Sequence, residues 1–190
     1  MASPLTHAAT GLALGFAFRK PGDGARAWIL GAFAAAAPDL DAFGVVFGIP
    51  YESPAWGHRG FTHGLLFAAL LAALLAWRAF PPERRRRIFL YFFVAAASHG
   101  LLDAMTSEGL GVAFFAPVWN ERYFLPWRPL LVTPLHPPHL FGLHLYGLRL
   151  FMVRMTELTT VWPCLGAFAA VAAWLRSRKG RSDEPLGQEA

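Results

Sequence analysis

Histidines and aspartates recur in this chain at spacings that suit a metal ion. Three short segments carry half of them: Pro38-Asp39-Leu40-Asp41, His58-Arg59-Gly60-Phe61-Thr62-His63 and His99-Gly100-Leu101-Leu102-Asp103. In the last segment a histidine and an aspartate are four residues apart, so on a helix both would lie on one face and could reach the same ion. A further histidine, His7, lies in the first apolar segment. The pattern predicts a metal site built from imidazole nitrogen and carboxylate oxygen.

The composition places these residues in a membrane protein. Of the 190 residues, 55% are hydrophobic and 15% are charged, and the mean hydropathy is +0.39. A soluble domain of this length is usually less apolar. Ionisable groups are costly in apolar segments, so they usually mark function there. Because Cys164 is the only cysteine, a thiolate-rich zinc site is excluded, and any metal must be held by histidine and carboxylate.

Five apolar segments predict an all-α, multi-pass transmembrane protein with four or five membrane helices. They lie near residues 4–18, 28–47, 64–80, 88–105 and 160–175. The first and last are short against the roughly 17–25 residues that a spanning helix needs. We expect residues 1–175 to form a single membrane-embedded domain and residues 176–190 to be a disordered polar tail.

Residues 106–159 form a region rich in aromatic residues and proline, without one clean spanning helix. We expect it to lie at the membrane interface and to cover the site as a lid. Its three histidines, His136, His139 and His144, could suggest a second metal cluster, but prolines between the first two break a simple helical face. We favour a surface or interfacial role for them.

The basic residues predict the orientation. They follow the first, third and fifth apolar segments, so twelve of the seventeen would lie at one side of the membrane. The positive-inside rule makes that side cytoplasmic. His7, Asp39, His63, His99 and Asp103 would then all lie near the periplasmic or outer face of a cell (inner) membrane protein. Because the orientation rests on the basic residues alone, this convergence independently supports a shared site.

Each residue also has an interpretation without metal. His99 and Asp103 could form a buried ion pair between helices. Asp39 and Asp41 could cap or interrupt a helix, and Thr62 could be the N-cap of the helix that follows it. We favour a shared site, because these interpretations treat the common depth of the residues as coincidence.

The motifs resemble those of the membrane-bound metal-dependent hydrolases, a family that includes LexA-regulated inner-membrane members and was formerly described as a domain of unknown function. The resemblance covers residues 1 to about 130 and rests on four motifs: Thr6-His7 with Gly11, Pro38-Asp39-Leu40-Asp41, His58-Arg59-Gly60-Phe61-Thr62-His63-Gly64, and Ser98-His99-Gly100-Leu101-Leu102-Asp103 with Thr106. Arg122-Tyr123-Phe124-Leu125-Pro126-Trp127-Arg128-Pro129 and Glu157 also look like one branch of that family. A more distant likeness is to zinc-dependent phospholipase C, whose His-x-x-x-Asp pair is matched here, whereas its second pair, His-x-x-x-Glu, is not.

We expect His7, Asp39, His63, His99 and Asp103 to bind one or two divalent ions. Zinc is the preferred ion, and manganese or iron would suit the same ligands. One ion would activate a water molecule, and a second, roughly 3.5–4 Å away, would stabilise charge on a phosphoryl oxygen.

Three further residues are predicted to act in catalysis: Asp41, His58 and Arg59. Asp41 and His58 could be additional ligands, could orient a ligand imidazole, or could serve as a general base. Arg59 could pair with a phosphate or carboxylate of the substrate, or it could contact a lipid headgroup.

These expectations define a membrane-bound metal-dependent hydrolase that cleaves an ester or phosphodiester bond of a lipid or lipid-linked substrate. Its partners would be membrane lipid, that substrate and the divalent metal. Nucleic acid binding is not expected, because the basic residues cluster between apolar segments. Two alternatives remain open: a metal or proton transporter, which would need polar groups at successive depths, and a structural membrane protein with a bound metal.

Overall fold

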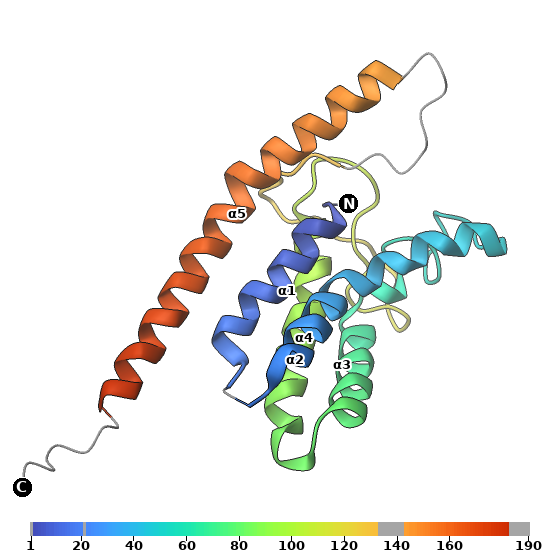
Figure 1. The fold of residues 1–190 in the computed structure, drawn as a ribbon. Coiled ribbons are helices and arrows are strands. Elements are labelled where there is room, and N and C mark those ends of the chain that lie inside the picture. Colours follow the sequence, from blue (N-terminus) through green and yellow to red (C-terminus); the bar gives the residue numbers. More distant parts are fainter. Residues whose placement is uncertain (1, 21, 133–142, 183–190) are drawn as a thin grey trace, which may run out of the picture.

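In residues 2–20, 22–132 and 143–182, which the computed structural model describes, the chain forms α-helices and 3-10 helices and no β-strand (Figure 1). The α-helices are α1 (Pro4–Phe18), α2 (Gly24–Ala36), α3 (Leu65–Ala79), α4 (Pro82–Ala104) and α5 (Leu143–Ser182), and the 3-10 helices are η1 (Ala37–Phe47) and η2 (Phe61–His63). Three helical stretches are long and apolar enough to cross a membrane: Gly24–Phe47, Pro82–Ala104 and Gly147–Arg178. The prediction of an all-helical, multi-pass membrane protein is confirmed.

Small residues allow the first four helices to pack closely. The core between α2, α3 and α4 is lined by buried alanines and by Ile88, Tyr91 and Phe92. The Tyr91 hydroxyl donates a hydrogen bond to the carbonyl of Gly11, at 2.8 Å, and occupies the space that a side chain at position 31 would need. Glycine is therefore required at position 31, where α2 approaches α4.

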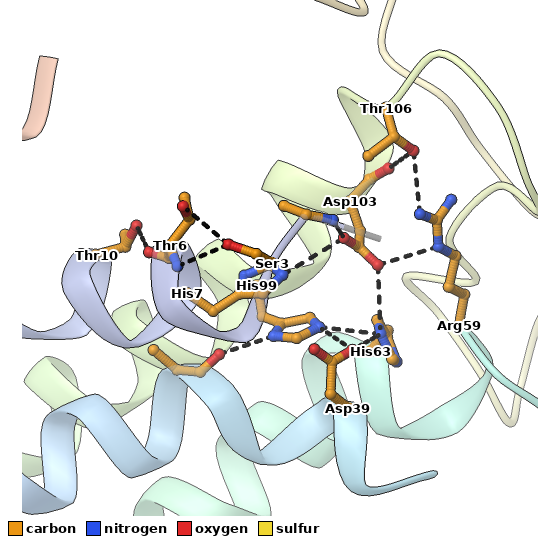
Figure 2. A network of polar contacts seen from close by, with 12 residues as sticks. Ser3, Thr6, His7, Thr10, Asp39, Arg59, His63, His99, Asp103 and Thr106 are labelled. Atoms are coloured by element: carbon orange, nitrogen blue, oxygen red, sulfur yellow. Dashed lines mark hydrogen bonds and ion pairs between the residues drawn. The ribbon is translucent and has the colours of Figure 1, made fainter. Parts of the chain in front are cut away.

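A proline ends α2 and starts η1. Pro38 has no backbone N–H, so it cannot make the α-helical hydrogen bond to a carbonyl four residues earlier. The chain continues from Ala37 to Phe47 in the tighter 3-10 geometry, and the helix predicted over 28–47 is thus divided in two. This change of helix type places Asp39 at the end of the bundle where α4 finishes (Figure 2). Asp41 follows on the same 3-10 helix and lies beside His63.

The opposite end of the bundle is basic. Arg87 reaches the loop between α1 and α2, where its guanidinium binds the Asp23 carboxylate at 2.6 and 2.9 Å. Arg26 donates to the carbonyl of Ala79, which joins α2 to the end of α3. The up-and-down arrangement therefore separates the arginine-rich turns from the end that carries Asp39 and Asp41.

The helix α5 is longer than the sequence predicts. It runs without interruption from Leu143 to Ser182, through a region expected to lack a spanning helix and into the expected tail. The expectation of no spanning helix is wrong for residues 143–159, and the expectation of a disordered tail is wrong for residues 176–182. Residues 183–190 lie outside the described part. Polar side chains such as Glu157 lower the hydropathy of residues 143–159, but Glu157 is buried against α1 rather than left in lipid. The helix can therefore continue through this stretch.

Candidate metal centre

The five predicted ligands come together at one end of the bundle (Figure 2). His7 lies in the first turns of α1, Asp39 in η1, His63 at the end of η2, and His99 and Asp103 in the last turns of α4. The side chains of His7, His63, His99 and Asp103 are fully buried, and that of Asp39 is 9% exposed. The sequence therefore identified five side chains that the fold brings into one cluster.

Within the described residues, these side chains form two groups of metal-binding size that share Asp103. One group comprises Asp39, His58, His63 and Asp103, and the other comprises His7, His99 and Asp103. In each group the candidate ligand atoms lie within 4.8 Å of one another. The Asp103 carboxylate has two oxygens, so it could bridge two ions. Each group therefore brings together donor atoms of the types that hold a divalent ion, and the presence of one or two ions stays a prediction.

The orientation of His99 suits a ligand. Its Nδ1 lies 2.7 Å from the carbonyl oxygen of Ala35, which fixes a proton on Nδ1 and leaves the lone pair on Nε2. That Nε2 is 3.0 Å from Nε2 of His63 and 3.3 Å from Oδ1 of Asp39. The His7 ring stacks on the His99 ring at 3.6 Å between centroids. Several potential ligand atoms therefore point into one small space.

Asp41 holds two histidines in place from outside this space. Its carboxylate lies 2.7 Å from Nδ1 of His58 and 3.2 Å from Nδ1 of His63. The hydroxyl of Thr62 donates a hydrogen bond to the same carboxylate at 2.5 Å. Thr62 is therefore not the N-cap of α3, which is Gly64. Both imidazoles therefore present Nε2 to the centre, an arrangement typical of carboxylates that orient metal-bound histidines.

Unpaired buried atoms show that the residues fit a divalent cation. Both ring nitrogens of His7, both carboxylate oxygens of Asp39 and Nε2 of His58 are buried and make no hydrogen bond with the described residues. Burial alone would lower the pKa of His63, but the nearby carboxylates of Asp103, Asp39 and Asp41 raise it to about 10. The carboxylates thus favour positive charge at this position, and an ion would satisfy the atoms that have no partner.

Arg59 is directed into the protein. It is buried, has a left-handed backbone with φ of 62°, and places Nε 3.0 Å from Oδ2 of Asp103. Its Nη2 donates to the hydroxyl of Thr106 at 3.1 Å, and its Nη1 donates to the carbonyl of Leu110. The sequence predicts that Arg59 pairs with a substrate or contacts a lipid headgroup, whereas in the structure its guanidinium binds the carboxylate of Asp103.

The N-terminal segment contributes contacts to the site that the motifs did not predict. The backbone N–H of Ala2 donates to Oδ1 of Asp103 at 2.8 Å. The residues that follow bind α5: the carboxylate of Glu157 accepts hydrogen bonds from the N–H and hydroxyl of Ser3, at 2.5 and 2.6 Å, and from the hydroxyl of Thr6, at 2.9 Å. In the sequence, Glu157 was singled out only by the family resemblance, because the region around it was expected to lack a clean spanning helix.

Three histidines of the sequence cannot be placed at this centre. His136 and His139 lie outside the described residues, and the side chain of His144 is not described. Their surface or interfacial role stays a prediction.

The chain matches known membrane proteins. Residues 1–180 match the model of a family described as YdjM inner membrane protein. The inner membrane protein YbcI of Escherichia coli (strain K12) is 35% identical over 136 residues, which cover 70% of this chain and 78% of YbcI. No solved structure matches the chain.

These matches correct the family expected from the sequence. They show a different family from the membrane-bound metal-dependent hydrolases, and neither description indicates a hydrolase or a phospholipase C. The resemblance was wrong because its motifs are short. Histidine and aspartate at helical spacing reflect the demands of a buried polar centre, which unrelated membrane proteins can meet in the same way.

Proposed function

Because the chain belongs to the YdjM inner membrane protein family, it is an inner membrane protein whose family description names no reaction, and we propose its activity from the geometry of the buried centre. The proposed function is metal-dependent hydrolysis of an ester or phosphodiester bond in a lipid or lipid-linked substrate. The observation that carries it is the position of Asp103 in both groups of potential ligands. A carboxylate shared in this way is typical of centres that hold two ions close together.

The donor set suits zinc, with manganese or iron as substitutes, because it combines imidazole nitrogens with carboxylate oxygens. His7, His99 and Asp103 would hold one ion, and Asp39, His63 and Asp103 would hold the other. Divalent ions held here would activate water and stabilise negative charge that develops on a carbonyl or phosphoryl oxygen.

His58, oriented by Asp41, can act as a general base. Asp41 fixes Nδ1 of His58 at 2.7 Å, and Nε2 of His58 is buried without a hydrogen bond among the described residues. That nitrogen is free to complete the ligand set or to accept a proton from attacking water. Arg59 positions Asp103 through their ion pair and takes no direct part in the reaction.

The surroundings of η1 support a lipid substrate. On this 3-10 helix, Leu40, Phe43 and Val46 recur every third residue and are 56%, 63% and 79% exposed, so they form one apolar face. Asp39 and Asp41 belong to the same helix, and their side chains keep 9% and 4% exposure while the ligand histidines have none. The centre thus lies beside an apolar surface, which suits an amphiphile that approaches within the membrane.

The distribution of charge favours a hydrolytic site over a transport path. In α4, the ionisable groups of types Asp, Glu, His, Lys and Arg occur only before Ile88 and after Ser98. A proton or metal path would need such groups at successive depths. The polar groups of α4 instead form one cluster at each end of the helix.

Metal analysis and turnover assays on the full chain in lipid nanodiscs would test the proposal. Wild type, His99→Ala, Asp103→Asn and the control Glu108→Gln would each be resupplied with zinc or manganese. Released headgroups from inner membrane lipids, and cleavage of bis-p-nitrophenyl phosphate and p-nitrophenyl esters, would be measured. Glu108 is a suitable control, because its carboxylate lies in an exposed ion pair with Arg149.

We expect one or two ions per chain and metal-dependent cleavage in the wild type and the control, with both lost in the two centre variants. A wild type with full metal content and no cleavage of any ester or phosphodiester would refute the reaction. A wild type that binds no metal would refute the centre itself.

A further inference from the structure

A groove lies at the basic end of the molecule, between the end of α3 and the start of α4. It is lined by Trp77, Pro82, Arg85, Arg86 and Phe89 and encloses about 520 Å³. The metal centre lies at the other end of α4, so nothing in the proposed function uses this groove (Figure 1). The groove combines aromatic walls with two cations.

The arginines at the start of α4 divide into two pairs with different surroundings. Arg84 and Arg87, three residues apart on one face, both turn to Asp23, at 3.5 and 2.6 Å. Their charge is therefore partly balanced by a carboxylate. Arg85 and Arg86 are on the face toward the groove.

The groove arginines have no acidic partner among the described residues. Arg85 donates to two neutral carbonyls, those of Phe80 at 3.1 Å and Trp77 at 3.3 Å, and its guanidinium lies 5.6 Å from the centre of the Trp77 ring. Arg86 is exposed and makes no ion pair or hydrogen bond with a described residue. Two positive charges thus face the groove without compensation, in a protein of formal net charge +5.

We propose that this groove binds an anionic phospholipid, with the phosphate at Arg85 and Arg86 and one acyl chain along Trp77 and Phe89. Charge complementarity selects the phosphate, since guanidinium groups bind phosphate through paired N–H donors. The apolar side walls select an amphiphile over a free anion, because Trp77 is 59% exposed and Phe89 lies beside it in the groove. Basic pockets between membrane helices bind lipid headgroups for the same reasons.

Native mass spectrometry of the full chain in detergent would test this site. Phosphatidylglycerol and phosphatidylcholine with identical chains would be titrated against the wild type, Arg86→Gln and Arg84→Gln. The two variants lose the same charge from neighbouring positions, and Arg87 still pairs with Asp23 in the second. They therefore separate a defined site from general attraction to negative lipid.

We expect the wild type to prefer phosphatidylglycerol. Arg86→Gln should weaken that binding about fivefold, which is typical for one arginine near a lipid surface. Arg84→Gln should change it less than about twofold, because its charge is already paired. Equal retention of the two lipids would overturn the proposal. So would equal losses in the two variants, or displacement of phosphatidylglycerol by an equal concentration of inorganic phosphate. None of these results depends on whether the metal centre is active.

Discussion

Arg59 and Asp103 form a buried ion pair in which Nε of the arginine lies 3.0 Å from Oδ2 of the aspartate, and neither side chain is more than 1% exposed. The pair joins the loop before η2 to the last turn of α4 (Figure 2). A buried charge whose partner is removed is strongly unfavourable. The position of the central carboxylate therefore depends on a residue that does not itself belong to either ligand group.

Substituting Arg59→Ala should destabilise the protein by about 3–5 kcal/mol, because it leaves the Asp103 carboxylate buried without its cation. The exposed pair of Arg149 and Glu108 provides the control, and Arg149→Ala should cost no more than about 1 kcal/mol. Denaturant unfolding in detergent, followed by circular dichroism, measures both. Similar losses in the two variants would show that the Arg59 pair contributes no more than a surface contact.

The Asp41→Asn variant should bind metal about 10–100-fold more weakly, the usual effect of losing a carboxylate that orients ligand histidines. An amide can accept from one of the two Nδ1–H groups but presents a donor to the other. Competition with a chromogenic chelator measures the affinity. Glu121→Gln, which changes an acid hydrogen-bonded to Tyr123 in an exposed loop, should leave it unaltered; a loss there as well would point to a general charge effect.

Truncation of Glu157 to alanine should lower stability by several kcal/mol. Three buried donors, from Ser3 and Thr6, would lose their acceptor, and each costs about 1–3 kcal/mol when unsatisfied. Metal binding should also weaken, since the segment that donates from Ala2 to Asp103 would lose its anchor. Unfolding and metal titration of Glu157→Ala beside Glu108→Ala measure the two effects. Normal metal affinity in a destabilised Glu157→Ala protein would limit its role to stability.

The basic end should face the cytoplasm and the metal centre the periplasm, because arginine and lysine are retained on the cytoplasmic side. In a Cys164→Ser background, a cysteine at Glu121 should react with a membrane-impermeant maleimide in intact spheroplasts, and a cysteine at Glu83 only after permeabilisation. Glu83 lies in the first turn of α4 beside the arginines, and Glu121 precedes Arg122, which donates to the carbonyl of His58. The reverse pattern of labelling would invert the orientation.

The sequence by itself determined the class of protein and the five residues that meet in the candidate centre. Apolar composition and the positions of helical segments depend on local chemistry, so α1 begins and ends where the first apolar segment does. Ionisable side chains in apolar segments are rare, and their cost singled out His7, Asp39, His63, His99 and Asp103 without any tertiary information. The family did not follow from those residues, because a few short motifs carry too little information to distinguish families.

The tertiary structure alone decided how the polar groups are paired. Ala2 and Asp103 are 101 residues apart, and Ser3 and Glu157 are 154 residues apart, yet each pair forms a hydrogen bond. Such contacts depend on which helix faces meet, and the pattern along one helix does not specify that. The same is true of Arg59, whose direction is set by a left-handed backbone and by acceptors on the loop after α4. Side-chain chemistry identifies candidates for a site, whereas packing between distant segments fixes their distances and partners.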